Sequence, residues 1–345
     1  MAVRVVLIGC GGRGTSAHGA WAVKSERLDL VAVCDVDAGR LQAASARLGV
    51  PGEADYRRLL ARADVQGVLI ATGARWHAPI ALEAIAAGKH VFVEKPLADS
   101  PESADAMACA VRAAGLVGVV GYQFRMSPFA AALAAELPAI EPVQALLTVQ
   151  RGPMAPQYFF PDHYGGVLDT ATHTIHLALW AMGGQAEGVM AHVRRGTIAG
   201  DQTIEYASLL IDFDGGTRSA ALVTSMFGVR APNLVEFVGS HGVVSSTGRL
   251  TAGVLQVVRH AGVGKPGAGL PEGLEVRTVE TAAGRPDTEA LLDHFADLIE
   301  GKADAARPTA CTFEQGAEAV AVTAAMARSA QEGRRVTLAE VARTA

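Results

Sequence analysis

The chain has 345 residues, and the 50% that are hydrophobic are enough to fill the cores of two domains of ordinary size. The formal net charge of −5 and the absence of any long basic cluster argue against nucleic acids and membrane surfaces as partners. No apolar run approaches the roughly 18 residues that a membrane-spanning helix needs, and the apolar run at the start of the sequence leads into glycines rather than into a small-residue cleavage site, so we expect a cytoplasmic protein.

The first 121 residues alternate strand-like apolar runs with helix-like segments, of which the first helix is expected at about 14–24. The strand-like runs, in chain order, read VRVVLIG, LVAVCD, VQGVLIAT, HVFVEK and LVGVVGY. Apolar strands that alternate with helices are typical of a parallel sheet covered on both faces. We therefore expect residues 1–121 to form one α/β domain.

Residues 122–345 follow a different pattern. Longer β segments with alternating character run from about 143 to 281, interrupted by a helix at about 167–182, and two helices close the chain. This pattern predicts an α+β domain built on a large, mostly antiparallel open sheet. The alternation in EYASLLIDF and RSAALVTSM is loose enough to suggest that both sheet faces are covered, which predicts a homodimer or homotetramer.

A glycine-rich turn follows the first strand and opens the first helix, in the pattern G-x-G-x-x-G. There, glycines allow a pyrophosphate to approach backbone N–H groups at the positive end of a helix. The second strand ends in Asp35, whose carboxylate can accept hydrogen bonds from both hydroxyls of a ribose. Asp35 favours NAD by repelling a 2′-phosphate, while Arg40 leaves NADP open, because an arginine can receive that phosphate. The predicted cofactor residues of this turn are Gly9, Gly11, Gly12, Arg13 and Gly14. Residues 1–121 are thus expected to be a Rossmann dinucleotide-binding domain.

The run VFVEKPLADS places Glu94 and Lys95 at the carboxyl end of a predicted parallel strand, where open α/β sheets bind their ligands. Lys95 is one of only five lysines in the chain, so lysine is not the usual surface cation of this protein. A residue that precedes a proline is pushed out of the α region, which keeps Lys95 extended. We expect its ammonium group to point into a ligand cleft.

The helix predicted at about 167–182 carries a polar face. At about 100° per residue, Asp169, His173 and His176 fall close together, apart from an apolar stripe. These groups could act on a substrate, ligate a divalent metal together with His163, or serve as caps and core residues. The four cysteines show no Cys-x-x-Cys spacing, and we expect neither a disulfide framework nor a metal.

The chain resembles the glucose-fructose oxidoreductase/inositol dehydrogenase (Gfo/Idh/MocA) family. The similarity rests on GCGGRG, EKP at 94–96, FRMSP at 124–128, GGVLDTATH at 165–173 and EGRRVTL at 332–338. The resemblance implies a cis bond between Lys95 and Pro96 and catalytic or substrate-binding roles for Asp169 and His173, with His173 as the proton donor and acceptor. His176 departs from the family pattern, in which many members carry an aspartate at that position.

The resemblance also implies further site residues. The loop with Thr72 and His77 approaches the nicotinamide in the family, although Gly73 and Ala74 replace the more usual proline and asparagine. Arg125 matches a segment at the domain junction that orders the cofactor pocket. The predicted substrate-binding residues are Tyr158, His163, Asp169, His173 and His176. Flat rings such as that of Tyr158 suit the C–H faces of a sugar, although ordinary packing explains such a cluster as well.

The leading functional hypothesis is hydride transfer between a nicotinamide and a secondary alcohol or ketone of a sugar, cyclitol or glycoside. His173 would take the hydroxyl proton, Lys95 would stabilise the developing alkoxide, and Asp169 would bind a neighbouring hydroxyl or orient the histidine. Two alternatives are an NAD-dependent glycoside hydrolase or lyase that oxidises the sugar transiently, and a non-catalytic nucleotide-binding regulator.

Overall fold

The computed structural model describes residues 2–150, 165–195, 204–225, 233–248, 253–260, 273–281, 287–303 and 310–342. The chain divides into two compact units. The first contains Met1–Met126 and Arg285–Val320, and the second contains Ser127–Gly284 and Ala321–Ala345. The boundary predicted at 121/122 lies near the point, after Met126, where the chain passes from the first unit into the second. Sequence reasoning did not predict that residues 285–320 return to the first unit.

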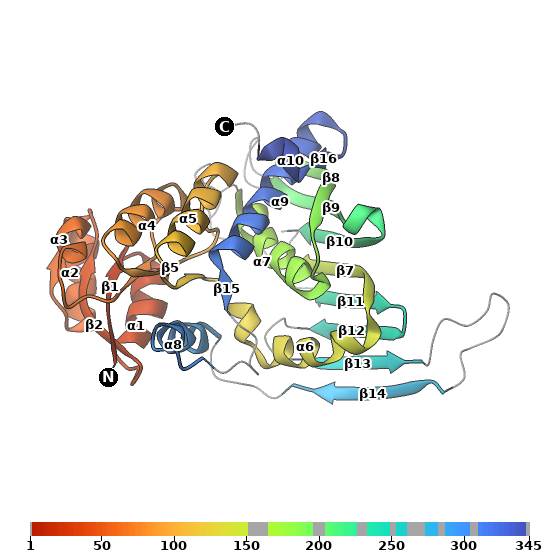
Figure 1. The fold of residues 1–345 in the computed structure, drawn as a ribbon, viewed down its shortest axis with the longest axis horizontal. Coiled ribbons are helices and arrows are strands. Elements are labelled where there is room, and N and C mark those ends of the chain that lie inside the picture. Colours follow the sequence, from red (N-terminus) through yellow and green to blue (C-terminus); the bar gives the residue numbers. More distant parts are fainter. Residues whose placement is uncertain are drawn as a thin grey trace. The chain divides into compact units, whose positions relative to one another are not determined.

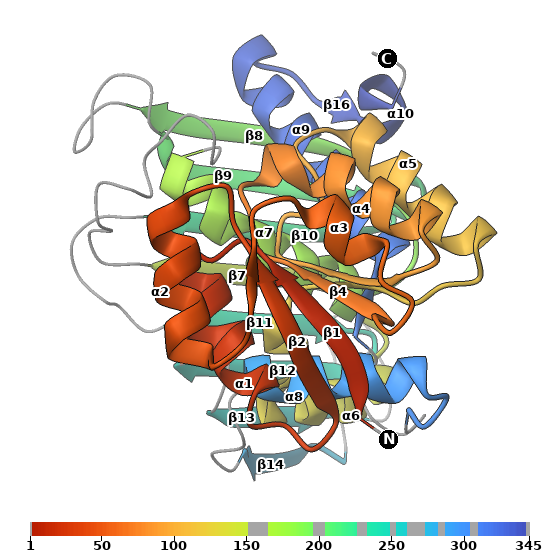
Figure 2. The same ribbon diagram turned by 90° about the vertical axis from the view of Figure 1, so that its left-hand side faces the viewer.

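The first unit is built on a seven-stranded sheet with the order β15-β6-β5-β4-β1-β2-β3 (Figures 1 and 2). Its strands are β1 (Val3–Ile8), β2 (Leu28–Cys34), β3 (Gly52–Glu53), β4 (Gly67–Ile70), β5 (His90–Val93), β6 (Gly118–Val120) and β15 (Cys311–Thr312). All neighbouring strands pair in parallel except β15, which runs antiparallel to β6. The predicted parallel sheet is therefore confirmed, with an antiparallel edge strand contributed from far along the chain.

The helices of the first unit begin and end at residues whose chemistry explains the boundaries. They are the π-helical η1 (Gly14–Gly19), α1 (Ala20–Ala22), α2 (Ala38–Leu48), α3 (Tyr56–Leu60), α4 (His77–Ala86), α5 (Pro101–Ala113) and α8 (Asp287–Ile299), with short 3₁₀ turns η2 (Ala74–Trp76) and η3 (Gln123–Met126). Asp37 caps α2 by accepting a hydrogen bond from the backbone of Arg40, and Gly49 ends that helix at a φ of 70°. Ser100 caps α5 just before Pro101.

Helix α8 completes the core of the first unit although it lies far from the other elements in sequence. Its residues Leu291, Leu292 and Phe295 are fully buried in the same cluster as strand residues such as Leu7 and Phe92. The ring of Phe295 lies edge-on to that of Phe92, with centroids 6.1 Å apart. Figures 1 and 2 both show α8 beside α1. The sheet of the first unit is therefore covered in part by a helix from the far end of the chain.

The second unit is built on a nine-stranded sheet with the order β14-β13-β12-β11-β7-β10-β9-β8-β16. Its strands are β7 (Pro142–Gln150), β8 (Ala186–Arg195), β9 (Ile204–Phe213), β10 (Arg218–Ser225), β11 (Asn233–Gly239), β12 (Gly242–Gly248), β13 (Val254–Arg259), β14 (Glu275–Glu280) and β16 (Val336–Thr337). Every neighbouring pair is antiparallel except β10 with β7. The predicted mostly antiparallel sheet is confirmed.

One face of this sheet is covered by helices. Figure 1 shows α6 (Pro128–Ile140) over β11–β13 and α7 (Gly165–Met182) over β7, β9 and β10. Alternate residues of β7 point toward these helices and are buried, namely Ala145, Leu147 and Val149. The chain ends with α9 (Phe313–Glu332) and α10 (Leu338–Val341). Among the described helices, none is both long and apolar enough to cross a membrane.

We predict that Phe295→Ala destabilises the first unit by about 3–5 kcal/mol, because the variant leaves a cavity between α8 and the sheet. Urea unfolding of the full chain, followed by circular dichroism, measures the change. Val36→Ala serves as the control, because the Val36 side chain is 89% exposed and its truncation should hardly matter. A urea midpoint of unfolding for Phe295→Ala equal to that of the control would contradict the conclusion that α8 completes the core of the first unit.

Candidate functional site

The glycine-rich loop forms a cradle at the carboxyl end of β1. Gly9 has a φ of 99°, and a Cβ atom there would lie 2.6 Å from the carbonyl group of Ala71. A Cβ atom on Gly14 would clash with the carbonyl oxygen of Gly9. Nothing lies within 4 Å of the corresponding positions on Gly11 and Gly12, so the loop is packed on one side and open on the other. This open backbone at the start of a helix fits the pyrophosphate of a dinucleotide.

Asp35 directly follows β2 and is held beside the cradle. Its carboxylate accepts hydrogen bonds from the backbone N–H groups of Cys10 and Asp37, both at 2.8 Å. The guanidinium of Arg40 donates to the same carboxylate, with Nη2 3.1 Å from Oδ1. Burial alone would raise the pKa of Asp35, but hydrogen bonds from Arg40 and from two backbone N–H groups outweigh burial and lower it. The group is therefore an anion that can receive ribose hydroxyls.

Lys95 follows β5, and its peptide bond with Pro96 is cis, which confirms what the resemblance implied. The backbone N–H of Lys95 donates to Oε2 of Glu94 at 3.0 Å. The other oxygen of Glu94, Oε1, lies 2.7 Å from Nε of Arg13 and 2.7 Å from Nε2 of His18. One carboxylate therefore joins the glycine-rich loop, the first helix and the strand end that carries Lys95.

Glu94 is nearly completely buried and still charged. Burial would raise the pKa of Glu94, but His18 and Arg13 outweigh burial and hold the pKa well below its ordinary value. A Cβ atom on Gly121 would lie 3.1 Å from Oε2, so the glycine at the end of β6 makes room for the carboxylate. Sequence reasoning did not include His18 among the candidate site residues. Nothing in its spacing indicated that it would contact a residue 76 positions away.

His77 braces the loop that follows Lys95. Its side chain is buried, with Nδ1 2.8 Å from the carbonyl oxygen of Pro96 and Nε2 3.1 Å from that of Thr72. Burial lowers the pKa of His77, and a neutral imidazole donates to one of these carbonyls at a time. The hydroxyl of Thr72 is buried and makes no hydrogen bond within the described part of the chain, which leaves a polar atom available to a cofactor.

Arg125 lies in η3 and is also buried. Its Nη1 donates to Oε1 of Gln315, the third residue of α9, at 2.6 Å. Arg125 therefore connects η3 to the part of α9 that belongs to the first unit. The structure thus gathers predicted cofactor residues of the first unit around Asp35, around Glu94 and around His77, whereas Arg125 contacts Gln315.

The second unit carries the remaining predicted residues on and before α7. His173 and His176 are buried, at 8% and 4% exposure. The apolar stripe predicted for this helix is buried as well, and it includes Ala171, Ile175, Leu179 and Met182. Tyr158, His163 and the side chain of Asp169 lie outside the described residues. Within the described ranges, no group of three or more His, Cys, Asp or Glu side chains is arranged to hold a metal ion.

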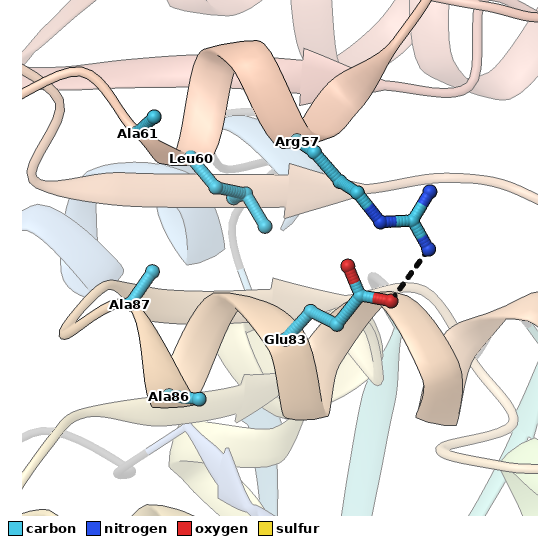
Figure 3. Close-up of a pocket in the computed structure, with 6 residues that line it drawn as sticks. All are labelled: Arg57, Leu60, Ala61, Glu83, Ala86 and Ala87. Carbon is cyan, nitrogen blue, oxygen red and sulfur yellow. Dashed lines mark hydrogen bonds and ion pairs between the residues drawn. The ribbon is translucent and has the colours of Figure 1, made fainter.

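A shallow hollow of about 320 Å³ lies between α3 and α4 (Figure 3). It is lined by Arg57, Leu60, Ala61, Glu83, Ala86 and Ala87. Arg57 and Glu83 form an ion pair across it, with 2.7 Å between Nη2 and Oε1. None of the residues predicted from the sequence lines this hollow, so it does not belong to the candidate site.

Comparison with known proteins identifies both parts of the chain. Residues 3–122 match a family described as "Oxidoreductase family, NAD-binding Rossmann fold", and residues 137–245 match a "GFO/IDH/MocA C-terminal domain". A "Glycosyl hydrolase family 109 protein" of Shewanella sp. strain W3-18-1 is 39% identical over 106 residues, which are 28% of this chain and 23% of that protein. A protein of the same name from Shewanella putrefaciens strain CN-32 matches over the same length at 39% identity. The matched segment is thus less than a quarter of these relatives.

Solved structures share the fold over almost the whole chain. An NAD-binding oxidoreductase from Klebsiella pneumoniae has a TM-score of 0.80 at 24% identity, covering 98% of this chain and 99% of that one. A putative NADPH-dependent oxidoreductase from Desulfitobacterium hafniense DCB-2 gives 0.80 at 20% identity, covering 99% of both chains. Levoglucosan dehydrogenase in complex with NADH and levoglucosan gives 0.80 at 22% identity, covering 98% and 100%. At these identities the likeness concerns the fold alone.

The family matches agree with the motifs and with the geometry of the first unit. The Rossmann match spans the glycine cradle, Asp35 and Lys95, and the second match covers β7–β11 and most of β12. NAD is the cofactor that this Rossmann family binds, and the glycine cradle fits it. The chain belongs to the Gfo/Idh/MocA family of oxidoreductases, with an NAD-binding Rossmann domain followed by the C-terminal domain of that family.

Proposed function

We propose that the protein is an NAD-dependent oxidoreductase that interconverts a secondary alcohol and the corresponding ketone of a sugar, cyclitol or glycoside. The observation that carries the proposal is the Glu94 carboxylate, which joins Arg13 of the glycine cradle to the backbone of Lys95. A lysine and a dinucleotide cradle so linked suit redox chemistry beside a nicotinamide. The shared fold of levoglucosan dehydrogenase, solved with NADH and a sugar, supports the substrate class.

The first unit would hold the cofactor. The open backbone at Gly11 and Gly12 would receive the pyrophosphate, and Asp35 the adenosine ribose. When bound, NAD supplies the group that accepts the hydride. The buried hydroxyl of Thr72 and the loop braced by His77 would contact the nicotinamide end, and Arg125 would hold η3 in place for the same pocket. Glu94 would contribute by fixing the loop, since its carboxylate already accepts from several donors.

Lys95 and His173 would carry the proton chemistry. An imidazole both accepts and donates a proton near neutral pH, so His173 would take the proton of the reacting hydroxyl. The ammonium group of Lys95 would stabilise the alkoxide as it develops, an effect that is larger in a water-excluded site. Glu94 cannot replace either group as an acid, because its pKa is held far below neutrality. The proposed substrate-binding partners are Tyr158, His163, Asp169 and His176.

We predict that Lys95→Ala lowers kcat by about a hundredfold or more while NADH still binds, because the variant removes charge stabilisation but leaves the cradle intact. Activity over a panel of aldoses, polyols and glycosides, followed by the absorbance of reduced nicotinamide, measures the change. Lys302→Ala is the matched control, since Lys302 is an exposed lysine paired with Glu300. Turnover of Lys95→Ala close to that of the control would remove Lys95 from the mechanism.

A second candidate function is favoured by the relatives named glycosyl hydrolase family 109, which are 39% identical over 106 residues. An enzyme of this kind would oxidise a sugar transiently, eliminate the aglycone, add water to the double bond that elimination leaves and then reduce the product again, using the same Lys95 and His173. The two functions differ in their cofactor balance. A dehydrogenase produces one reduced nicotinamide for each substrate, whereas the hydrolase produces none in the steady state.

We expect the purified protein to form one NADH for each molecule of substrate oxidised when it is given NAD and an aryl glycoside in one assay. Absorbance of NADH and release of the aryl group are recorded together, with Lys95→Ala as the blank. Accumulation of NADH without release of the aryl group supports the first function. Release of the aryl group with no net NADH would show that the second function is the right one.

We also propose that the open face of the nine-stranded sheet binds a second copy of the chain. The residues on this face that pair across β8, β9, β10 and β7 are apolar, and they are Met190, Leu210, Ala221 and Leu146. One row away, across β11, β12, β13 and β14, the pairing residues are again apolar, and they are Val238, Val243, Val258 and Val276. Each of these two rows is a line of residues that pair across neighbouring strands, and its remaining half is mainly polar. The eight apolar residues together form a diagonal apolar stripe.

Exposure and charge are consistent with such a contact. Met190, Leu210 and Val276 are 45%, 42% and 62% exposed, which is unusual for apolar side chains set in adjacent rows. A stripe bordered by polar residues, such as Glu236 and Asp212, can meet an identical stripe and keep the borders in water. A homodimer is the simplest assembly that covers it, and a homotetramer can contain the same contact.

We predict that Leu210→Glu yields a single chain of 35.7 kDa in light scattering, whereas the unaltered protein has a multiple of that mass. A carboxylate buried within the stripe by association has no partner, which disfavours association. Gln256→Glu is the matched control, because Gln256 lies on the same face in the polar half of a row. A mass of one chain for the unaltered protein would contradict the proposal.

A further inference from the structure

We infer that His18 is a positioning residue for the proposed reaction, because it holds the carboxylate of Glu94, and through that carboxylate the backbone of Lys95, in one orientation. The catalytic role of Lys95 rests on the proposed function. The contacts that join His18, Glu94 and Lys95 all lie within the first unit, so the effect of His18 on Lys95 can also be measured without a substrate.

His18 lies on the buried face of η1, a π-helical turn. Turns of this kind are rare and occur frequently at functional sites. The His18 side chain is 1% exposed, and its ring lies edge-on to that of Phe92, with centroids 5.2 Å apart. Phe92 belongs to β5, so the imidazole packs against the strand that leads to Lys95.

The contact between His18 and Glu94 has a defined direction. The pKa of Glu94 is held well below its ordinary value, and an ionised carboxylate only accepts hydrogen bonds. Nε2 of His18 therefore carries the hydrogen of the 2.7 Å contact with Oε1. The other ring nitrogen, Nδ1, is buried and makes no hydrogen bond within the described part of the chain. The bond to Glu94 thus determines how the imidazole is oriented.

Arg13 is the second donor to Oε1 of Glu94, with Nε also at 2.7 Å, but its surroundings differ. The Arg13 side chain is 42% exposed, and its Nη2 donates to the hydroxyl of Thr288 at 3.1 Å. Phosphate oxygens that enter the glycine cradle can attract this guanidinium. The contact made by His18 is enclosed and shielded from water. His18 is therefore the donor that keeps Oε1 in place when Arg13 changes partner.

The other oxygen of Glu94 transmits this orientation to Lys95. Oε2 accepts the backbone N–H of Lys95 at 3.0 Å, while the backbone N–H of Glu94 donates to the carbonyl oxygen of Ile70 at 2.9 Å. The backbone of Glu94 is thus held by β4, and its side chain is held by His18. Loss of the His18 donor lets the carboxylate turn, and the N–H of Lys95 then loses its fixed acceptor. A shift of about 1 Å at a reacting group can lower a rate about a hundredfold.

A purely structural role for His18 predicts a different result. Removal of the imidazole would then lower the free energy of unfolding of the first unit, but the molecules that remain folded would keep Lys95 in its original environment. A variant that restores only the hydrogen bond to Glu94 separates the two roles. Glutamine places its amide N–H near the position of Nε2, whereas the shorter asparagine cannot reach Glu94.

The experiment observes Lys95 directly by NMR of the full-length protein. The chain has only five lysines, so reductive methylation with isotope-labelled formaldehyde gives few dimethyllysine signals, and Lys95→Arg identifies the signal of Lys95. In His18→Asn we expect this signal to shift or broaden. In His18→Gln we expect it to stay at its original position. His18→Phe keeps a ring beside Phe92 without the donor, so it should behave like His18→Asn and replaces that variant if it does not fold.

His90→Asn is the matched control, because His90 begins the same strand and its Nδ1 accepts from the backbone N–H of Val117 at 3.0 Å rather than contacting Glu94. This variant should leave the signal of Lys95 unchanged. With a substrate of the panel, His18→Asn should lower kcat about 10- to 100-fold relative to the control, and His18→Gln should recover most of the loss.

An unchanged Lys95 signal in folded His18→Asn, or equal shifts in the asparagine and glutamine variants, would overturn the inference. A kcat of His18→Asn equal to that of His90→Asn would do the same. Absence of oxidoreductase activity in the unaltered protein, with every sugar and polyol of the panel, would instead overturn the proposed function. The NMR comparison would still show whether His18 orients Lys95.

Discussion

The buried carboxylate of Glu94 is the group on which the arrangement of the first unit depends. A buried anion persists only if positive and hydrogen-bonding groups surround it, and here they come from Arg13, His18 and the backbone of Lys95. Arg13 and His18 belong to the start of the first helix, at and within η1, whereas Lys95 follows β5. Their positions are therefore coupled, and the glycine cradle cannot shift without disturbing the strand end that carries Lys95.

The buried carboxylate of Asp35 is also kept charged, but by a different set of donors. Both carboxylates follow a parallel strand, and both have a lowered pKa. Glu94 is nearly completely buried, and its donors include the buried imidazole of His18 and the backbone of Lys95, which makes it a fixed support. Asp35 accepts from two backbone N–H groups and from Arg40, a side chain that is about half exposed. One sheet edge thus carries two charged carboxylates that differ in how far their donors are exposed.

The parts of this structure that sequence predicts are those with local causes. Strand alternation, the spacing from Gly9 to Asp35 and the Lys95–Pro96 pair each act over a few residues or a short unit, and each was predicted. The contact of His18 with Glu94 and the packing of Phe295 on Phe92 were not, because both join positions far apart in the chain. The polar face of α7 was predicted from periodicity, but periodicity alone did not indicate that His173 and His176 are both buried.

The path of the chain limits how the nucleotide-binding unit can be transferred to another protein. A graft of residues 1–121 would lack α8 and β15, and it would expose the apolar surface that Phe295 and its neighbours shield. Recombination at a single crossover point therefore cannot exchange this unit intact. Homologous replacement has to occur at several junctions at once, so the two units are expected to be inherited together.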